Sequence, residues 1–239
     1  MNFTEILAQK ALEAGLDLSE KQLEQFNIYY EMLIETNKVM NLTAITEPED
    51  VAVKHMIDSL LAFDKSFAHK TLADVGTGAG FPGIPLKIYC PSLKITLIDS
   101  LGKRLKFLES IIGKLELTDI ACEHARAEDV GRNKKYREQF DLVTARAVAR
   151  LSVLSEYCLP LVKPGGMFIA LKGSKYAEEI SEGEAALKIL GGKLISAEEV
   201  KLPGLDDGRA IIRIKKIKST PLTYPLKAGI PDKEPLGKK

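Results

Sequence analysis

Two aspartates and a glycine-rich loop are the residues whose types and spacing best suit ligand binding. An apolar run over residues 71–75 leads into DVGTGAG (74–80), in which every second position after Asp74 is glycine. Glycine tolerates positive φ and lets a ligand approach bare backbone amides. A second apolar run, 93–98, ends at Asp99, which is placed to bond ribose hydroxyls. This order of acid, glycine loop, helix, strand and acid predicts a nucleoside-binding βαβ unit.

The glycine spacing discriminates between nucleoside cofactors. In the dinucleotide pattern G-x-G-x-x-G that begins at Gly76, the third glycine would fall on Phe81, so the match to an NAD-dependent oxidoreductase fails there. The pattern acidic-x-G-x-G-x-G does fit, and it is typical of methyltransferases that use S-adenosyl-L-methionine (SAM). SAM has no pyrophosphate and needs instead a tight backbone and a carboxylate. A structural glycine turn in another α/β protein is the alternative. The candidate cofactor-binding residues of this unit are Asp74, Gly76, Thr77, Gly78, Gly80, Phe81 and Asp99.

Strands and helices alternate through the middle of the chain, and these elements must position the cofactor-binding residues. Short apolar runs predict strands at 71–75, 93–98, 119–124, 140–147 and 167–171, and helices are expected at about 82–90, 102–114, 151–160 and 175–190. Residues 193–202 and 209–217 predict two final strands joined by a turn. We therefore predict an α/β fold with a mostly parallel, doubly wound, seven-stranded sheet and an antiparallel edge. Ligands of such sheets bind beyond the carboxyl ends of the strands, where Glu128, Arg146 and Lys172 also fall.

The N-terminal part of the chain predicts helices packed on this core. Residues 3–14 and 19–36 carry apolar side chains at helical spacing, and a third helix is expected at about 48–63. His55 and Asp58 lie three positions apart on that helix and share one face. This polar face either lines a site or is a satisfied edge of the core. The expected division of the chain is a helical segment 1–69, a SAM-binding domain 70–219 and a basic C-terminal tail 220–239.

Composition and charge narrow the class of protein. The 239 residues are 45% hydrophobic and 28% charged, as in ordinary globular proteins. No apolar run reaches about 18 residues, so no membrane-spanning helix is expected. The three cysteines are widely spaced, which suits free thiols in a reducing cytoplasm and neither a metal site nor a disulfide framework. Residues 1–50 carry 3 basic and 10 acidic side chains, whereas residues 209–239 carry 9 basic and 2 acidic, which indicates an anionic partner or a solvated tail.

Several segments together resemble one protein family. They are NLTAIT (41–46), HMIDSL (55–60), DVGTGAGFPGIPL (74–86), FDLVTARAVARL (140–151) and YPLKAGIPDKEPL (224–236). The chain resembles the RsmG family, also called glucose-inhibited division protein B, of 16S rRNA guanine-N7 methyltransferases. The resemblance implies the class I SAM-dependent methyltransferase (Rossmann-like) fold, SAM as cofactor, and a guanine of 16S ribosomal RNA in the 30S subunit as substrate, with no membrane and no metal. The chain departs from the family at Leu226, where Tyr-Pro is usually followed by arginine.

The resemblance also assigns roles to residues outside the glycine loop. Ala127 and Glu128 match the segment beside the adenine, and Arg146 matches an arginine beyond the fourth strand that contacts the RNA or the cofactor. We expect Asn41, His55 and Asp58, with Arg146, to position the target base, although holding the N-terminal helices in place is an equal alternative for these three. The expected RNA-binding cations are Lys103, Arg104, Lys172, Arg209 and Lys227.

The sequence lacks the motifs of methyltransferases that act on amino groups or on cytosine C5, which fits methylation of a ring nitrogen. Guanine N7 has a free lone pair and no proton to lose, so the enzyme needs mainly positioning and electrostatics. Amino-directed enzymes normally show an Asp/Asn/Ser-Pro-Pro-aromatic run after the fourth strand, where this chain has TARA, and no cysteine follows a proline as in cytosine-C5 enzymes. The alternative is a ribosome-associated RNA-binding factor with a SAM-type fold that acts on another RNA or without catalysis.

Overall fold

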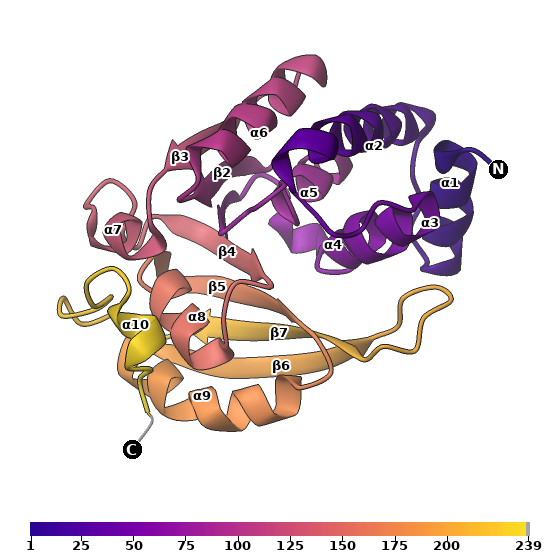
Figure 1. Ribbon diagram of the computed structural model, residues 1–239. Helices are drawn as coiled ribbons and strands as arrows, with labels where there is room; N and C mark the ends of the chain where they lie inside the picture. The colour runs from indigo at the N-terminus through magenta and orange to yellow at the C-terminus, as the bar shows by residue number, and fades with distance from the viewer. Residues whose placement is uncertain (238–239) are drawn as a thin grey trace.

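The apolar runs form one sheet of seven strands in the order β3-β2-β1-β4-β5-β7-β6, seen in the computed structural model, which describes residues 1–237 (Figure 1). Strands β1 to β5 pair in parallel, and β7 runs antiparallel to both β5 and β6. The predicted seven-stranded sheet with an antiparallel edge is confirmed. The strands are β1 (Thr71–Val75), β2 (Lys94–Asp99), β3 (Ile120–His124), β4 (Phe140–Arg146), β5 (Val162–Lys172), β6 (Gly192–Val200) and β7 (Arg209–Lys216).

Helices cover both faces of the sheet because successive strand residues point to opposite sides. Leu72 of β1 belongs to one buried cluster, whereas Ala73 and Val75 belong to the other. The first cluster includes residues of α1 (Phe3–Glu13), α2 (Glu20–Met40), α5 (Gly83–Tyr89) and α6 (Gly102–Lys114). The second includes residues of α7 (Ala127–Arg132), α8 (Leu151–Cys158) and α9 (Tyr176–Leu190).

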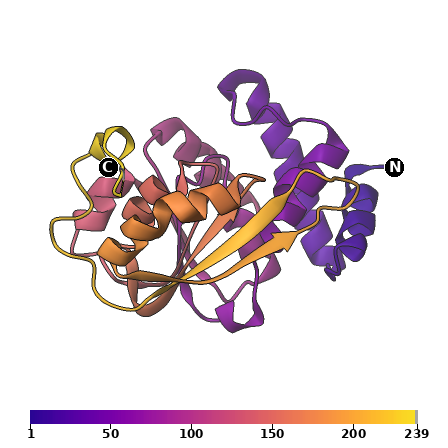
Figure 2. The ribbon, with the colours of Figure 1, turned by 90° about the horizontal axis from the view of Figure 1, so that it is seen from below.

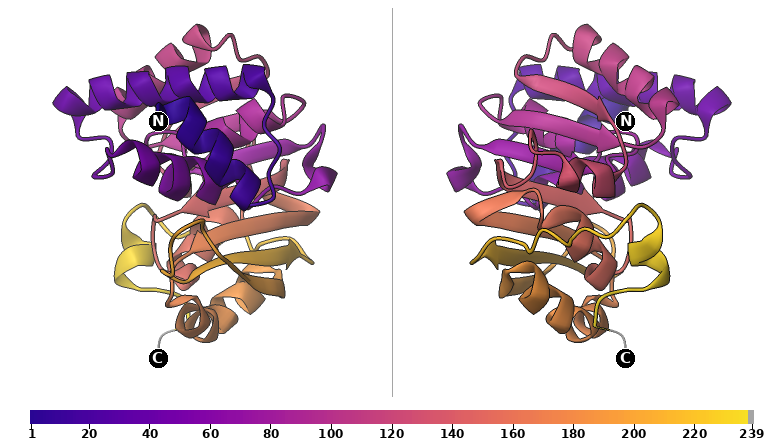
Figure 3. Two further views of the ribbon diagram at one scale, coloured as in Figure 1. Left: turned by 90° about the vertical axis from the view of Figure 1, so that its right-hand side faces the viewer. Right: turned by 90° about the vertical axis from the view of Figure 1, so that its left-hand side faces the viewer.

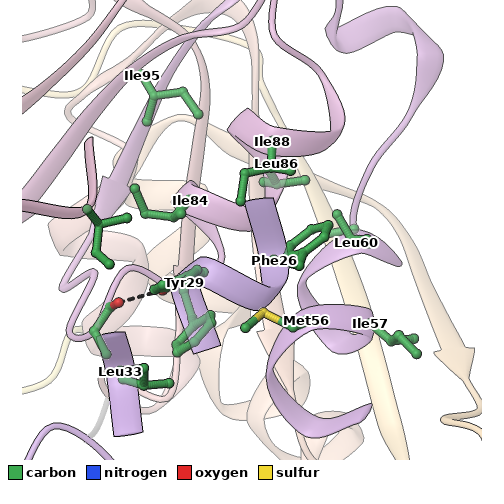
Figure 4. Packing of buried hydrophobic residues seen from close by; sticks show 14 of the residues in the cluster. Phe26, Tyr29, Leu33, Met56, Ile57, Leu60, Ile84, Leu86, Ile88 and Ile95 are labelled. Atoms are coloured by element: carbon green, nitrogen blue, oxygen red, sulfur yellow. Dashed lines mark hydrogen bonds between the residues drawn. The ribbon is translucent and has the colours of Figure 1, made fainter. Parts of the chain in front are cut away.

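The N-terminal helices share their core with the sheet domain. Phe26, Tyr29 and Leu33 of α2 are completely buried and meet Met56 and Ile84 in one cluster (Figure 4). Burying each such side chain contributes about 1.5–3 kcal/mol relative to exposure. The hydroxyl of Tyr29 also donates to the carbonyl of Ala79 over 2.5 Å. The N-terminal segment is therefore fixed directly on the glycine-rich loop.

The predicted helix over 48–63 is instead three short pieces. It comprises α3 (Pro48–Val51), a π-helical segment (Ala52–Ile57) and α4 (Asp58–Leu60). Such π-segments are rare and occur often at functional sites. Helix α2 is also longer than expected, because it ends only where Asn41 adopts the left-handed conformation with φ 48°.

Strand β5 starts five residues earlier than predicted. The sequence Lys163-Pro164-Gly165-Gly166 indicated a turn, yet it lies within β5, where the pairing to β4 shifts register between Phe140 and Leu142. Proline and glycine are tolerated in a strand at such irregular positions. At the other end of the sheet, the β6–β7 hairpin reaches back toward α1 (Figure 2), and Leu202 and Leu205 join the cluster there.

The segment after β7 lies on the domain. From Thr220 the chain runs to the side of α7 and α8 and ends in the short helix α10 (Ile230–Lys233) (Figure 3). The last two positions of the predicted tail 220–239 lie outside the described residues. Within the described part of the chain, no helix combines the length and apolarity needed to cross a membrane.

Candidate active site

The glycine-rich loop follows β1 and has one residue that faces open space. Gly76, Gly78 and Gly80 all have positive φ, at 67°, 62° and 105°. A Cβ atom on Gly76 would lie 2.6 Å from Val148, and one on Gly80 would lie 2.8 Å from Ile84. A Cβ on Gly78 would meet only the carbonyl of Gly76, at 3.9 Å. The loop is thus tightly packed on its inner side and leaves the backbone of Gly78 open to a ligand.

Asp74 and Thr77 support the loop from beneath. The Asp74 carboxylate is fully buried and accepts hydrogen bonds from the Thr77 hydroxyl (2.7 Å) and the Gly83 amide (2.9 Å). Its other oxygen has no partner within the described residues, and burial raises the pKa of this carboxyl to about 6. Both residues were expected to bind the cofactor; in the structure their polar side-chain atoms contact the loop itself.

Asp99 joins the loop to the end of β2. Its carboxylate accepts hydrogen bonds from the amides of Gly78 (3.0 Å) and Leu101 (2.9 Å), and Arg104 lies 3.4 Å away. Asp99 is only 4% exposed. Asp99 lines a cavity. Gly78, whose surroundings are open, and the aspartate that the sequence predicts to bind ribose therefore lie together at the carboxyl ends of neighbouring strands.

This cavity, of about 320 Å³, fits the expected cofactor. Gly76, Asp99, Ala127 and Glu128 were predicted to bind the cofactor and do line it. A carboxylate and a bare loop backbone are what a nucleoside with an amino-acid group requires. Among residues 1–237, no group of three His, Cys, Asp or Glu side chains is arranged to hold a metal ion. The complete lining is Val75, Gly76, Ile98, Asp99, Ser100, Arg104, Ala125, Arg126, Ala127, Glu128, Ala147, Val148 and Tyr157.

A second group of predicted residues gathers around Arg146, at the end of β4. The guanidinium donates to Asp58 Oδ2 (2.7 Å) and to the carbonyl of Lys54 (3.0 Å), and lies 3.2 Å from His55 Nδ1. It also lies over the ring of Phe81, 5.0 Å from its centre. The structure therefore brings together three separate stretches of the sequence: residues 54–58, Phe81 and Arg146. Phe81, predicted at the cofactor, belongs to this Arg146 cluster and is stacked on His55 at 4.4 Å.

His55 in this cluster is uncharged at neutral pH. Burial and the charge of Arg146 lower its pKa to about 3. Because the guanidinium can only donate, His55 Nδ1 accepts, and Nε2 carries the proton that it donates to the Thr43 hydroxyl over 2.8 Å. Asn37 holds the backbone of Thr43 through two hydrogen bonds of 2.9 Å. Asn41 is instead exposed at the end of α2 and has no contact in this network.

Thr43 was missed by the sequence reasoning, although it lies in the same NLTAIT segment as Asn41. The polarity of asparagine made position 41 the better candidate, and its left-handed backbone shows that it serves as a helix end. Tyr157 and Val148 of the cofactor cavity were also missed. Tyr157 lies on α8 with no motif around it, so the sequence carries no signal for its role.

A second cavity, of about 370 Å³, opens beside the Arg146 cluster and shares Ala147 and Val148 with the cofactor cavity. We name it the acceptor cleft. Lys172 and Arg209, two of the predicted RNA-binding cations, line it. The complete lining is Asp58, Arg146, Ala147, Val148, Ala149, Arg150, Leu171, Lys172, Gly173, Glu179 and Arg209.

The predicted RNA-binding cations do not form one surface. Lys172 is 8% exposed and pairs with Glu179 at 2.6 Å, and Arg209 pairs with Asp207 at 2.9 Å. Arg104 lines the cofactor cavity. Lys103 and Lys227 are exposed, on α6 and in the C-terminal segment respectively.

Comparison with known proteins places this geometry in a family. The family model described as "rRNA small subunit methyltransferase G" (GidB) matches residues 22–206. The chain is 58% identical over 226 residues to "Ribosomal RNA small subunit methyltransferase G" of Lactobacillus acidophilus, covering 93% of this chain and 94% of the relative. It is 53% identical over 228 residues to the protein of that name from Exiguobacterium sibiricum, covering 94% and 95%.

Solved structures of lower identity share the fold. P. horikoshii TYW2 in complex with MeSAdo matches with a TM-score of 0.56 at 15% identity, covering 69% of this chain and 63% of that one. The 16S rRNA (adenine(1408)-N(1))-methyltransferase from Catenulisporales acidiphilia matches with a TM-score of 0.52 at 15% identity, covering 68% and 94%. The predicted class I SAM-dependent methyltransferase fold with added N-terminal helices is confirmed.

Proposed function

This chain belongs to the family of rRNA small subunit methyltransferase G, and we propose that it transfers the methyl group of SAM to N7 of a guanine in 16S rRNA. The observation that carries the proposal is the shared wall of the two cavities. Ala147 and Val148 border both the cofactor cavity, which contains Asp99, and the acceptor cleft, which contains Arg146. A donor and an acceptor bound in the two cavities would meet at this wall.

Bound SAM supplies an electrophilic methyl group on a sulfonium. The residues of the chain have to orient the two reactants, because N7 attacks with a free lone pair and needs no general base. Gly78 and Asp99 hold the cofactor side. On the acceptor side, Arg146 is fixed by Asp58 and His55, so its guanidinium is preorganised to orient the base or a phosphate beside it.

Charge in the acceptor cleft also suits this reaction. Positive charge develops on the purine as N7 is alkylated, so carboxylates near the base lower the barrier and unbalanced cations raise it. Asp58 and Glu179 line the cleft and pair with Arg146 and Lys172. The other two cations of the lining, Arg150 and Arg209, pair with Glu182 and Asp207, so all four cations of the cleft have an acidic partner and the cleft is polar without a large excess of positive charge.

We further propose that the substrate is an assembled 30S subunit or precursor in the cytoplasm. The formal net charge is only +1, and several predicted RNA-binding cations are engaged in ion pairs. Phosphate contacts supply most of the affinity for free nucleic acid. A chain with nearly balanced charge, in which three of the five predicted RNA-binding cations are paired with carboxylates, is better suited to recognise a structured particle than free RNA.

The test is transfer of labelled methyl groups from SAM to purified 30S subunits, to 16S rRNA and to tRNA, followed by nucleoside analysis. We expect labelled 7-methylguanosine in 16S rRNA, most of all in 30S subunits, and its loss in an Asp99→Ala variant. SAM binding without transfer to any of the three RNAs would overturn the proposal and favour the RNA-binding factor without catalysis.

A further inference from the structure

Residues 220–237 lie against the two helices that form the outer wall of the cofactor cavity. Helix α7 provides Ala127 and Glu128 to that wall, and α8 provides Tyr157. The C-terminal segment passes beside both helices and packs tightly on Gly131 of α7, where a Cβ atom would lie 2.9 Å from Pro225. Figure 3 shows this segment, in yellow, at the edge of the domain.

Two arginines hold the backbone of the segment. Arg137 donates to the carbonyls of Thr220 and Tyr224, each over 2.8 Å, and Arg132 Nε donates to the carbonyl of Pro225 over 2.8 Å. Hydrogen bonds from a charged donor are stronger than those between neutral groups. The chain therefore follows a fixed path from Thr220 to Pro225.

Two buried glutamates accept hydrogen bonds from the amides further along. The amide of Leu226 donates to Glu156 over 2.6 Å, and the amide of Gly229 donates to Glu128 over 2.8 Å. Glu156 is fully buried and Glu128 is 4% exposed. A buried carboxylate is costly without hydrogen-bond donors. Undocking the segment would deprive both glutamates of their partners within the described residues.

Glu128 links the segment to the cofactor. It lines the cofactor cavity, yet its one hydrogen bond within residues 1–237 comes from Gly229, at Oε1. Gly229 has φ +79°, and a Cβ atom there would meet nothing within 4 Å. The glycine is thus required by the backbone turn that aims its amide at Glu128, and not by crowding.

We propose that the C-terminal segment is part of the cofactor site: Gly229 is a positioning residue that holds Glu128 in the wall of the cavity, so that docking of the segment and binding of SAM favour each other. The inference rests on the proposed function, which supplies SAM as the ligand. The inference gives the backbone of the C-terminal segment a role in cofactor binding. Lys227, the predicted RNA-binding residue of this segment, is exposed and makes none of these contacts.

The test compares two glycines with the same backbone. Gly15, in the turn after α1, has φ +73° and equally open surroundings, so alanine imposes a similar strain there, far from the cavity. In the full chain, we expect Gly229→Ala to raise the Kd for SAM at least fivefold and Gly15→Ala to change it less than twofold. The KM for SAM should rise in the Gly229 variant, with kcat at saturating SAM unchanged.

A second variant and a measurement on the unaltered protein guard against misfolding. Arg132→Met removes a clamp whose side-chain hydrogen bonds, within the described residues, all go to the C-terminal segment, and this variant should also weaken SAM binding. By thermodynamic reciprocity, SAM should slow hydrogen exchange of the amides of Leu226 and Gly229 in the unaltered protein. Unchanged exchange, with Kd values within twofold in both variants, would overturn the inference. Failure of the unaltered protein to bind SAM would instead overturn the proposed function.

Discussion

The cofactor cavity and the acceptor cleft share a wall but are built in different ways. The base of the cofactor cavity is one contiguous stretch, 74–83, with Asp99 at the end of the next strand, and these residues are held together mainly by backbone amides. The acceptor cleft depends on side chains from separate elements, with Arg146 in contact with Asp58 across 88 positions. The glycine loop and Asp99 therefore depend largely on local backbone geometry, whereas the acceptor cleft exists only when the N-terminal helices are docked.

The difference extends to electrostatics. The Asp99 carboxylate is buried, but it accepts two amide hydrogen bonds and its ion-pair partner Arg104 is 34% exposed, whereas both side chains of the Arg146–Asp58 ion pair are buried, with exposures of 11% and 6%. Removing one partner of such a buried pair leaves an uncompensated charge. Changes in the acceptor cleft should therefore affect stability and catalysis together, and changes at Asp99 should act mainly on the cofactor.

The largest effect is expected for Arg146→Met, which removes the charge and keeps most of the volume. Methyl transfer to 30S subunits should fall on the order of 10²–10³-fold because the base is no longer oriented. The free energy of unfolding should fall by about 3–5 kcal/mol because Asp58 stays charged and buried. The Kd for SAM should change only a few-fold. Transfer assays, urea unfolding and calorimetric titration measure the three quantities.

The control is the double variant Arg146→Met/Asp58→Asn. It removes both charges, so most of the lost stability should return while transfer remains low. If the double variant also regained methyl transfer, the role of Arg146 would be only to hold the helices in place. The acceptor cleft would then differ from the cofactor cavity only in its contribution to stability.

Asp99→Ala probes the other region. The carboxylate accepts two amide hydrogen bonds, and each bond to a charged group is worth about 1.5–3 kcal/mol. We expect the Kd for SAM to rise about 100-fold, since the loop and a ligand contact are lost together, with 30S binding within a few-fold of normal. The Asp99→Asn variant keeps an acceptor oxygen for the Gly78 amide, so its Kd for SAM should rise only about tenfold. Equal losses of SAM and 30S binding would show that the two regions are not separable.

The same contrast explains how much the sequence predicted. Gly76, Gly78 and Asp99 could be found because a tight loop at a strand end needs these residue types at fixed spacing. The seven strands and the antiparallel edge followed from the alternation of apolar runs, whereas the order of the strands in the sheet came only from the structure. The broken helix around His55 was not predicted, because its π-segment lies within an otherwise regular helical pattern and coincides with the contact to Arg146.

Contacts between distant segments were beyond the sequence. Helical spacing placed His55 and Asp58 on one face, and the family resemblance grouped them with Arg146, but nothing in the sequence indicated the direct contacts that Arg146 makes with both. Thr43 lies two residues from the favoured Asn41, yet Thr43 contacts His55 while Asn41 is exposed at the end of α2. The C-terminal segment is the clearest case, because it is held through its own backbone amides and carbonyls, which every residue carries.

A smaller effect is expected for pH, and on the acceptor side it comes from His55. The pKa of His55 is about 3 in the fold against 6.5 in the unfolded chain, so the unfolded state binds more protons between these values. Stability therefore falls as pH drops below about 6.5. From pH 7 to pH 5, this group should cost roughly 2 kcal/mol. Urea unfolding of the unaltered protein and of His55→Gln at both pH values measures the difference.

Asp74 makes the comparison with His55→Gln necessary. Its pKa is raised to about 6, so protonation of Asp74 stabilises the fold as pH drops through 6 and opposes the effect of His55. The opposing contribution is common to both proteins and cancels in their difference. A difference that is the same at pH 7 and pH 5 would mean that His55 is protonated in the fold, which is incompatible with acceptance of a hydrogen bond from Arg146.

The smallest effect is expected at Lys103, which is exposed on α6 next to Arg104 of the cofactor cavity. If this side chain makes one phosphate contact, Lys103→Ala should weaken 30S binding only a few-fold and reduce the slope of log K against log salt by about 1. The Kd for SAM should not change, because the ammonium is solvated and Arg104 keeps its ion pair with Asp99. An unchanged salt slope would remove α6 from the RNA-binding surface, and the acceptor cleft would then have to provide the RNA contacts from the side of β5 and β7.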